Sequence, residues 1–169
     1  MNNENTGGAT APLFNIVLTN PEIPGNTGSI GRTCVGLGVR LHLIHPLGFD
    51  LSEKAVRRAG LDYWKYADIR EHQSFDDFLK TEGIQDSERD NQKLIFFSRF
   101  SQDNIFYNAP YKKDCYLIFG SETKGLPQDI LKKYEKNCYG LPLYSEHIRS
   151  LNLSNVATTA AYECLRHLI

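Results

Sequence analysis

The sequence contains few cysteines and no arrangement of side chains that would hold a metal. Four cysteines stand singly among the 169 residues, with no CxxC pair: Cys34, Cys115, Cys138 and Cys164. Five histidines are dispersed, and each is interpreted as an ordinary surface or packed residue: His42, His45, His72, His147 and His167. A disulfide framework and a zinc site are therefore disfavoured. No secretory signal peptide is recognisable, so we expect a cytoplasmic location and no bound metal.

Long hydrophobic runs, a charge excess and the common nucleotide-binding patterns are also missing. No apolar run approaches the roughly 20 residues that cross a bilayer, so we expect a soluble protein without membrane contact. The net charge is −1 at pH 7, and any contact with nucleic acid must come from a local basic patch. Neither a Walker loop nor a GxGxxG pattern occurs, which disfavours NTP binding and a dinucleotide-dependent oxidoreductase.

The composition that remains is that of an ordinary globular domain. Hydrophobic residues make up 41% of the chain and charged residues 23%, which supports one core in a single domain. Residues 1–12 are small, polar and rich in glycine, with no periodicity that could bury a face. We predict a disordered leader over 1–12 and one folded domain over 13–169.

From residue 13 onward, short apolar runs alternate with amphipathic stretches. The apolar runs predict strands over 13–19, 39–45, 63–71, 93–98, 115–120 and 138–143. The amphipathic stretches predict helices over 26–37, 52–60, 74–83, 126–134 and 152–169. Ser74 and Gly83 are the expected caps of the third helix, and Pro127 is expected in the first turn of the fourth. This alternation is typical of an α/β fold with a mostly parallel sheet and helices on both faces.

Three polar segments interrupt the apolar pattern, at 20–34, 118–127 and 148–163. The first two join an apolar run to a helix-like stretch through glycine, asparagine and serine, which leave backbone N–H groups free to face a ligand. The first and third segments lie far apart in the sequence, so the fold must bring them together if they form one site. We therefore predict that the three polar segments converge.

In the first polar segment, Asn26 and Arg32 could bind an anion where a strand turns into a helix. Arg32 follows Asn26 by six residues, nearly two helical turns, so we expect both on roughly one side of the helix. A helix N-terminus and a planar guanidinium suit a phosphate or a carboxylate. A capped helix with a solvated arginine explains the same residues equally well.

The second and third polar segments each allow a ligand and a simpler explanation. Gly120 directly follows an apolar run, where a flat ligand could approach the backbone, and Glu122 follows in the turn. A plain turn with permissive glycines is the alternative. In the third segment, Asn152 or Ser154 can cap the closing helix, but 150–155 holds more hydroxyls and amides than capping needs. This surplus favours a ligand.

A basic patch lies between the first and second polar segments. Lys54, Arg57 and Arg58 fall on one face of the predicted helix over 52–60 and precede the aromatic pair Tyr63–Trp64. Such a patch beside aromatic rings can hold an RNA backbone and stack an unpaired base. A solvated helix face gives the same pattern, so this feature alone leaves RNA contact open.

Four stretches together resemble the SpoU branch of the SPOUT RNA methyltransferases: NPEIPGNTGSIGRTC, RRAGLDYW, GSETKGLP and SLNLSN. The resemblance spans residues 13–169 and is greatest to the tRNA ribose 2′-O-methyltransferases that act on the wobble nucleotide. It implies an α/β fold with a C-terminal deep trefoil knot, an exception to the rule that chains do not thread themselves. It also implies S-adenosylmethionine bound in the knot, the anticodon loop of a tRNA as substrate, and a homodimer whose site takes residues from both subunits.

The resemblance also assigns roles to particular residues. It implies that Arg32, Ser150 and Asn152 take part in catalysis, and that Asn26 and Glu122 organise the loops or the substrate. It places the cofactor against four residues: Phe97, Gly120, Leu141 and Ser150. The basic patch of Lys54, Arg57 and Arg58 remains a candidate for holding the RNA.

The expected reaction is in-line attack of a ribose 2′-hydroxyl on the methyl group of the cofactor, which needs no metal. Because the pKa of a guanidinium lies above about 12, we expect Arg32 to hold the neighbouring phosphate and orient the hydroxyl. Ser150, Asn152 or a phosphate oxygen would accept the proton. Two alternatives are methylation of another tRNA site or of ribosomal RNA, and a module that binds RNA or adenosine without catalysis.

Overall fold

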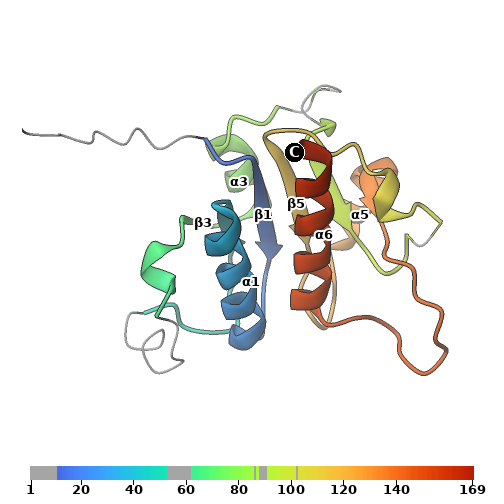
Figure 1. The fold of residues 1–169 in the computed structure, drawn as a ribbon, viewed down its shortest axis with the longest axis horizontal. Helices are drawn as coiled ribbons and strands as arrows, with labels where there is room; N and C mark the ends of the chain where they lie inside the picture. The colour runs from blue at the N-terminus through green and yellow to red at the C-terminus, as the bar shows by residue number, and fades with distance from the viewer. Residues whose placement is uncertain (1–10, 53–61, 86, 88–90, 102) are drawn as a thin grey trace, which may run out of the picture.

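The computed structural model describes residues 11–52, 62–85, 87, 91–101 and 103–169 (Figure 1). Two sequence-based expectations therefore fall largely outside the described residues. One is the leader over 1–12, of which only residues 11 and 12 are described, and the other is the helix over 52–60, of which only residue 52 is described. All that follows concerns the described part of the chain.

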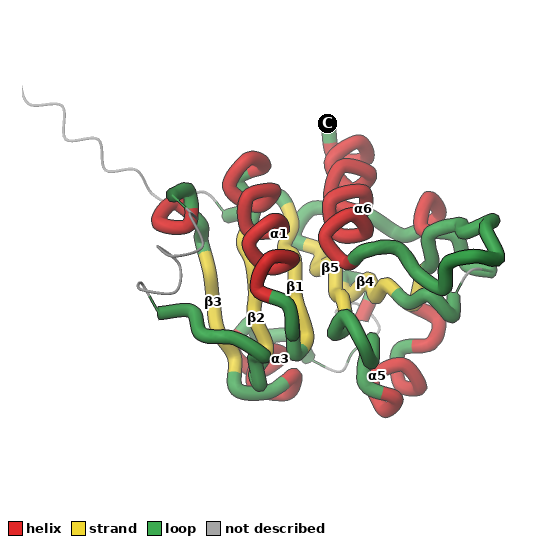
Figure 2. The backbone as a smooth tube through the Cα atoms, turned by 90° about the horizontal axis from the view of Figure 1, so that it is seen from below, coloured by secondary structure: helices red, strands yellow, loops and turns green. Residues whose placement is uncertain are grey.

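Six parallel strands form one sheet, in the order β3-β2-β1-β5-β4-β6 (Figure 2). Their bounds are β1 (Phe14–Thr19), β2 (Arg40–Ile44), β3 (Ile69–His72), β4 (Leu94–Phe97), β5 (Cys115–Phe119) and β6 (Cys138–Tyr139). Every residue of β1, β4 and β5 is buried, as a parallel sheet covered on both faces requires. The predicted fold class is confirmed.

Helices cover both faces of the sheet. In Figure 2, α1 (Pro24–Leu37) and α6 (Leu153–Leu168) lie side by side on one face, and α3 (Phe75–Thr81) and α5 (Gln128–Lys133) lie on the other. Short 3₁₀ turns complete the described elements: Trp64–Tyr66, Phe106–Asn108 and Glu135–Asn137. None of the described helices combines the length and the apolar character that crossing a bilayer needs.

Side-chain alternation along β1 explains the two layers. Ile16 and Leu18 belong to the cluster under α1 and α6, whereas Val17 points to the cluster under α3 and α5. On α6, Ala157 and Ala160 are fully buried, and their small side chains let this helix pack closely. The carboxyl ends of β1 and β5 are thereby fixed next to the first turns of α1 and α6.

The predicted strand over 63–71 is wrong in its first half. Residues 64–66 form a 3₁₀ turn, and the strand β3 covers only Ile69–His72. The cause is a tertiary contact: the Trp64 ring packs where a Cβ on Gly31 would stand, 2.5 Å from its Cζ3 atom. Packing against α1 overrides the β-propensity of the aromatic run.

The remaining differences are at element ends. α1 begins at Pro24, two residues before the predicted start at 26, and β6 covers only Cys138–Tyr139 of the predicted 138–143. Pro127 is the N-cap of α5 rather than a residue of its first turn. Ser74 caps α3 as predicted, and Gly83 follows the C-cap residue with a left-handed φ of 65°.

Candidate active site at the carboxyl ends of the strands

The three polar segments meet at the carboxyl ends of β1 and β5. These two strands are neighbours, β2 and β3 extend the sheet on one side, and β4 and β6 extend it on the other. The winding of the chain therefore reverses between β1 and β5, which is where open α/β sheets bind their ligands. The first polar segment leaves β1 here, and the second leaves β5 here.

The carboxylate of Glu122 holds the start of α1. α1 has no side-chain cap of its own at Ile23. Glu122 Oε2 accepts a hydrogen bond from the backbone N–H of Glu22 at 2.8 Å, and Glu122 Oε1 accepts from the N–H of Ile23 at 3.1 Å. Oε1 also accepts from Asn26 Nδ2 at 3.1 Å. A negative charge from the second polar segment thus caps a helix of the first, where the helix dipole favours it.

The Glu22 carboxylate, from the first polar segment, in turn accepts hydrogen bonds from the second. Its Oε2 accepts from the backbone N–H of Thr123 at 3.1 Å, and its two carboxylate oxygens lie 2.9 and 2.7 Å from the Thr123 hydroxyl. The first and second polar segments are therefore joined by two carboxylates that each bond to the other segment's backbone.

Asn152 connects the third polar segment to this pair. Its Oδ1 caps α6 by accepting from the N–H groups of Ser154 at 2.8 Å and Asn155 at 3.4 Å, and from the Ser154 hydroxyl at 2.6 Å. Its Nδ2 donates to Asn26 Oδ1 at 3.0 Å. The hydrogen bonds that link Glu122 to Asn26 and Asn26 to Asn152 confirm the predicted convergence of the three polar segments.

Replacing Glu122 by glutamine is expected to lower the free energy of unfolding by about 1–3 kcal/mol, because charged acceptors contribute that much to a hydrogen bond. The amide would also present an N–H to the N–H groups of Glu22 or Ile23. Urea unfolding measures the change. The matched control is Glu135→Gln, at the start of a 3₁₀ turn away from this site; an equal loss there would contradict the role of Glu122.

A cavity of about 360 Å³ opens beside these contacts. Its lining comes from the start of α1, from the loops that follow β4, β5 and β6, and from the first turn of α6. It includes all four residues that the resemblance places against a cofactor, together with three of the motif residues: Phe97, Gly120, Leu141, Ser150, Asn26, Glu122 and Asn152. The volume lies within the range of ligand pockets.

The cavity combines an apolar floor with polar walls. Phe97 stacks on Phe119, with ring centroids 4.7 Å apart and an angle of 14° between the planes, and both rings are buried. Sequence reasoning missed Tyr139, Arg99 and Phe100, which also line the cavity. Arg99 and Phe100 could have been predicted from the sequence, because they come just after the end of a predicted strand and close to Phe97, which the resemblance places against the cofactor.

Gly120 is required for a reason that differs from the predicted one. A Cβ at this position would stand 2.0 Å from the carbonyl carbon of Gly125 and 2.1 Å from the backbone nitrogen of Leu126. The backbone of Ser121 bonds to that of Gly125 in both directions, at 3.1 and 2.9 Å, and closes the loop on itself. The space that a Cβ of Gly120 would occupy is filled by this loop, while Gly120 itself lines the cavity.

Ser150 and Asn152 lie at the cavity but differ in what their oxygens can accept. Asn152 Oδ1 already receives the three hydrogen bonds that cap α6. Ser150 is exposed, and no hydrogen bond of its hydroxyl is found among the described residues. Of the two oxygens, that of Ser150 is the one left able to accept a further hydrogen bond.

Arg32 lies away from this cavity, and its predicted orientation is wrong. Asn26 is only 8% exposed and lines the cavity, whereas Arg32 is exposed and does not line it. A separation of six residues is one third of a turn short of two full helical turns. The side chains of Asn26 and Arg32 therefore point in directions that differ by one third of a turn. The Arg32 guanidinium lies over the Tyr63 ring, 4.7 Å from its centroid.

Tyr63 is itself fixed to α1. Its hydroxyl donates a hydrogen bond to the carbonyl oxygen of Gly28 at 2.6 Å. Burial raises the pKa of the Tyr63 phenol, and the positive charge of Arg32 partly opposes this rise. The basic patch of Lys54, Arg57 and Arg58 that precedes Tyr63 lies outside the described residues.

His42 and His72 are packed residues, as the sequence interpretation allowed, but they form a pair that the sequence did not indicate. Parallel pairing of β2 and β3 brings their imidazoles to 2.9 Å between His42 Nδ1 and His72 Nε2. Burial, and after it the neighbouring His72, lower the pKa of His42 to about 3. Only the register of two strands could have revealed this pair, and the misplaced strand over 63–71 concealed it.

Comparison with known proteins identifies related chains. The profile of the SpoU rRNA Methylase family matches residues 13–162. A protein of Listeria monocytogenes, provisionally named tRNA (cytidine(34)-2'-O)-methyltransferase, is 47% identical over 152 residues, which cover 89% of this chain and 86% of that protein. A solved structure described as giving insight into 2-OH methylation of C/U34 on tRNA has a TM-score of 0.76 at 39% identity, covering 90% of this chain and 94% of that one.

More distant structures share the fold. An AdoMet-bound rRNA methyltransferase of Sinorhizobium meliloti has a TM-score of 0.75 at 21% identity, covering 95% of this chain and 59% of its own. The family profile contains the first two polar segments completely and nearly all of the third. The same segments build the cavity and the Glu122, Asn26 and Asn152 contacts. The chain therefore belongs to the SpoU rRNA methylase family and has the fold of the SPOUT methyltransferases.

Proposed function

We propose that this protein is a tRNA 2′-O-methyltransferase that transfers a methyl group from S-adenosylmethionine to the ribose of the pyrimidine at position 34, in the anticodon loop. The observation that carries the proposal is the cavity in which the three polar segments of the family meet, linked through Glu122, Asn26 and Asn152. The named activities of the 47% identical protein and of the 39% identical structure point to the same substrate.

The cavity suits S-adenosylmethionine in size and chemistry. Its volume of about 360 Å³ and its walls of loop backbone around Phe97, Gly120 and Leu141 offer apolar contact and peptide hydrogen-bonding groups. The AdoMet-bound Sinorhizobium structure of the same fold supports this cofactor. The cofactor supplies a sulfonium-bound methyl group with its own leaving group, so the protein has to supply position and a proton acceptor.

The residues of the chain then have separate tasks. We assign Ser150 to accept the hydrogen bond of the attacking 2′-hydroxyl, because no hydrogen bond of its own hydroxyl is found among the described residues. Because a neutral serine hydroxyl is too weak a base to keep the proton, Ser150 passes its own proton on to a phosphate oxygen of the RNA or to water as it takes up that of the 2′-hydroxyl. Asn152 caps α6 and does not take the proton, since its Oδ1 already accepts three hydrogen bonds. Arg32 binds the phosphate next to the target ribose, for which a planar guanidinium is suited.

The position of Arg32 supports a homodimer. Because Arg32 does not line the cavity of its own chain, we infer that the phosphate it binds belongs to a substrate bound at the cavity of a second copy. Exposed apolar side chains lie at the N-cap of α1 and on the neighbouring α6, with Ile23 47% and Tyr162 57% exposed. A twofold arrangement would place Arg32 of each copy at the other's cavity.

Removing the platform beneath Arg32 is expected to slow methyl transfer. Tyr63→Ala takes away the ring on which the guanidinium lies, and a cation–π contact of about 0.5–2 kcal/mol corresponds to roughly 3- to 30-fold in rate. The cofactor affinity should stay unchanged. Single-turnover transfer assays measure the rate, and Tyr66→Ala, which removes the ring beneath Lys65, is the matched control. A fall in cofactor affinity instead would contradict this role.

The function is tested by incubating the purified protein with methyl-labelled S-adenosylmethionine and tRNA from cells that lack wobble methylation. Label in a 2′-O-methylpyrimidine at position 34 is the expected result. Label at another tRNA position, or in ribosomal RNA offered in parallel, would keep the enzyme class and replace the substrate. Failure to bind the cofactor would overturn the assignment and favour a module that binds RNA or adenosine. We keep the cytosol as the predicted compartment.

A further inference from the structure

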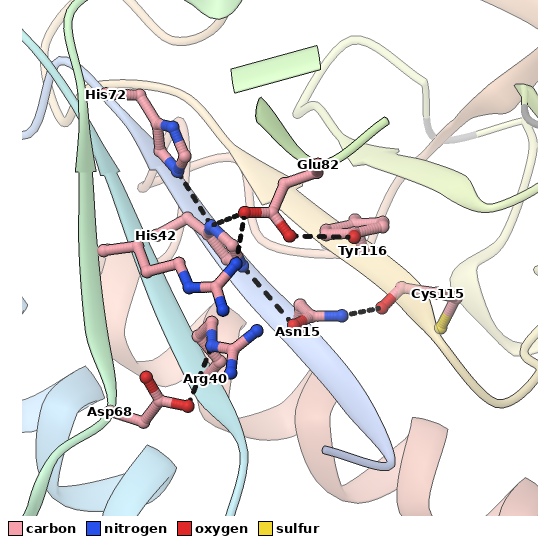
Figure 3. Close-up of polar contacts among 9 residues, drawn as sticks. Asn15, Arg40, His42, Asp68, His72, Glu82, Cys115 and Tyr116 are labelled. Atoms are coloured by element: carbon pink, nitrogen blue, oxygen red, sulfur yellow. Dashed lines mark hydrogen bonds and ion pairs between the residues drawn. The ribbon is translucent and has the colours of Figure 1, made fainter. Parts of the chain in front are cut away.

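A second group of buried polar side chains lies on the opposite face of the sheet from the candidate active site's helices α1 and α6. His42 stands in the middle of β2, His72 ends β3, and Glu82 is the C-cap residue of α3 (Figure 3). His42 is 0% and His72 2% exposed, and the Glu82 side chain is 7% exposed. One atom from each of the three side chains lies within 4.8 Å of the other two.

A hydrogen-bond chain fixes which nitrogen of His42 faces this group. Asn15 Nδ2 donates to the carbonyl oxygen of Cys115 at 3.4 Å, which leaves Asn15 Oδ1 to accept. That oxygen lies 3.4 Å from His42 Nε2, so His42 carries its proton on Nε2 and a lone pair on Nδ1. The Nδ1 lone pair points at His72 Nε2, 2.9 Å away, with Glu82 Oε1 at 3.8 Å (Figure 3).

We infer that His42 Nδ1, His72 Nε2 and Glu82 Oε1 form a binding site for a divalent transition-metal ion of the zinc class. Two imidazoles and one carboxylate are ligands that zinc accepts, with a fourth position left to water. Ligand atoms at about 2.0–2.1 Å from a tetrahedral ion stand about 3.3 Å apart. The separations of 2.9 and 3.8 Å lie on either side of that value, and all three ligand atoms lie within 4.8 Å of one another, so the atoms would have to approach one another by up to about 1.5 Å to hold an ion.

The surroundings resemble the outer contacts of metal sites. Asn15 orients His42 through the nitrogen that does not face the site, as carbonyl oxygens do for metal-bound histidines. The Tyr116 hydroxyl lies 3.4 Å from Glu82 Oε2, the oxygen that the ion does not use. On binding, the proton of His72 moves from Nε2 to Nδ1, so both imidazoles remain neutral and no net proton is lost.

The guanidinium of Arg70 would compete with the ion for Glu82, and this competition allows a specific test. Arg70 Nη1 donates to Glu82 Oε1 at 2.8 Å, so a guanidinium shares the oxygen that would bind the metal. The Arg70 side chain is 43% exposed and can turn into solvent when an ion takes its place. A bound ion would join the edge strand β3 to β2 and to the end of α3, and so would act as a structural staple.

Zinc binding is measured by calorimetry on the untagged full-length protein after treatment with a chelator and dialysis. We expect one Zn²⁺ per chain, with Glu82→Gln and His72→Gln each weakening the affinity at least tenfold. The matched control is His45→Gln, which removes a histidine just beyond the end of β2 whose Nε2 lies 2.8 Å from Glu71 Oε2. Zn²⁺ affinity that survives both site variants, or that falls in His45→Gln instead, would overturn the site.

A second measurement does not depend on variants that remove ligands. Arg70→Gln takes away the competing positive charge and is expected to raise the Zn²⁺ affinity, whereas Arg166→Gln, at another exposed Arg–Glu pair, should leave it unchanged. Zn²⁺ should raise the Tm of the wild type by about 5 °C at a large excess over its Kd, and leave the Tm of Glu82→Gln unaltered. No rise in the wild type would show that the group is only a hydrogen-bonded network.

Discussion

Replacing Arg32 by alanine is expected to reduce methyl transfer to tRNA by roughly 10²–10³-fold, the range seen when one positioned electrostatic group is removed from an active site. The affinity for S-adenosylmethionine should remain within about twofold of the wild type, because Arg32 does not line the cavity of its own chain. Single-turnover methylation with saturating tRNA measures the first effect, and equilibrium binding of the labelled cofactor measures the second.

Arg166→Ala is the control for general loss of positive charge. Arg166 is exposed on α6 and pairs with Glu163 at 2.7 Å, so its removal should leave turnover close to that of the wild type. A large loss of cofactor affinity in Arg32→Ala would show that the residue belongs to the cofactor site of its own subunit. That result would contradict both the phosphate role and the argument for a shared site.

A mixed dimer gives a sharper test of the same residue. Leu141→Trp would fill the cavity with an indole and abolish cofactor binding, while its Arg32 stays intact. Mixing this variant with Arg32→Ala under conditions of subunit exchange gives heterodimers with one complete site. About a quarter of the wild-type activity should return, since half of the dimers are mixed and each has one of two sites. No recovery would place Arg32 and the cavity in the same subunit.

The sequence predicted the central strands of the sheet well because they are buried on both faces. Runs such as residues 14–19 are mostly apolar, and such runs carry a signal that does not depend on distant contacts. The N-cap role of Ser74 was predictable for the same reason, since its hydroxyl bonds to the Asp77 N–H three residues later. Both predictions depended only on residues that are close together in the sequence.

The parts that were not predictable depend on tertiary contacts. Trp64 leaves the predicted strand because Gly31 offers it a flat place on α1. His42 and His72 meet only because β2 and β3 pair in one particular register. Glu122 caps a helix that begins about 100 residues earlier, which no local pattern indicates. Each of these contacts joins segments that are far apart in the chain.

The candidate site was likewise predictable only in part. The sequence predicted that the three polar segments converge, and the fold brings them together. Which oxygens are already occupied became visible only in the structure, because Asn152 Oδ1 caps α6 and no hydrogen bond of the Ser150 hydroxyl is found among the described residues. The trefoil knot implied by the resemblance to the SPOUT enzymes stays a prediction.

Gly120→Ala is expected to destabilise the protein by at least about 3 kcal/mol, the upper end of the cost of overpacking, and to abolish cofactor binding. A methyl group there would stand 2.0 Å from the Gly125 carbonyl carbon, and the backbone it meets cannot rotate aside as a side chain would. The loop from Ser121 to Leu126 would have to move, and with it the wall of the cavity and the Glu122 carboxylate that caps α1.

Gly36→Ala provides the matched control, because a Cβ at Gly36 meets nothing within 4 Å and the residue lies inside α1. That substitution should be neutral or stabilise the protein by up to about 1 kcal/mol, since alanine favours the helix over glycine. Urea unfolding and cofactor binding distinguish the two variants. If Gly120→Ala bound the cofactor normally and unfolded like Gly36→Ala, the loop would be able to open without loss. The cavity would then not depend on the close approach of Gly125 to Gly120, and the fixed position of Glu122 would need another cause.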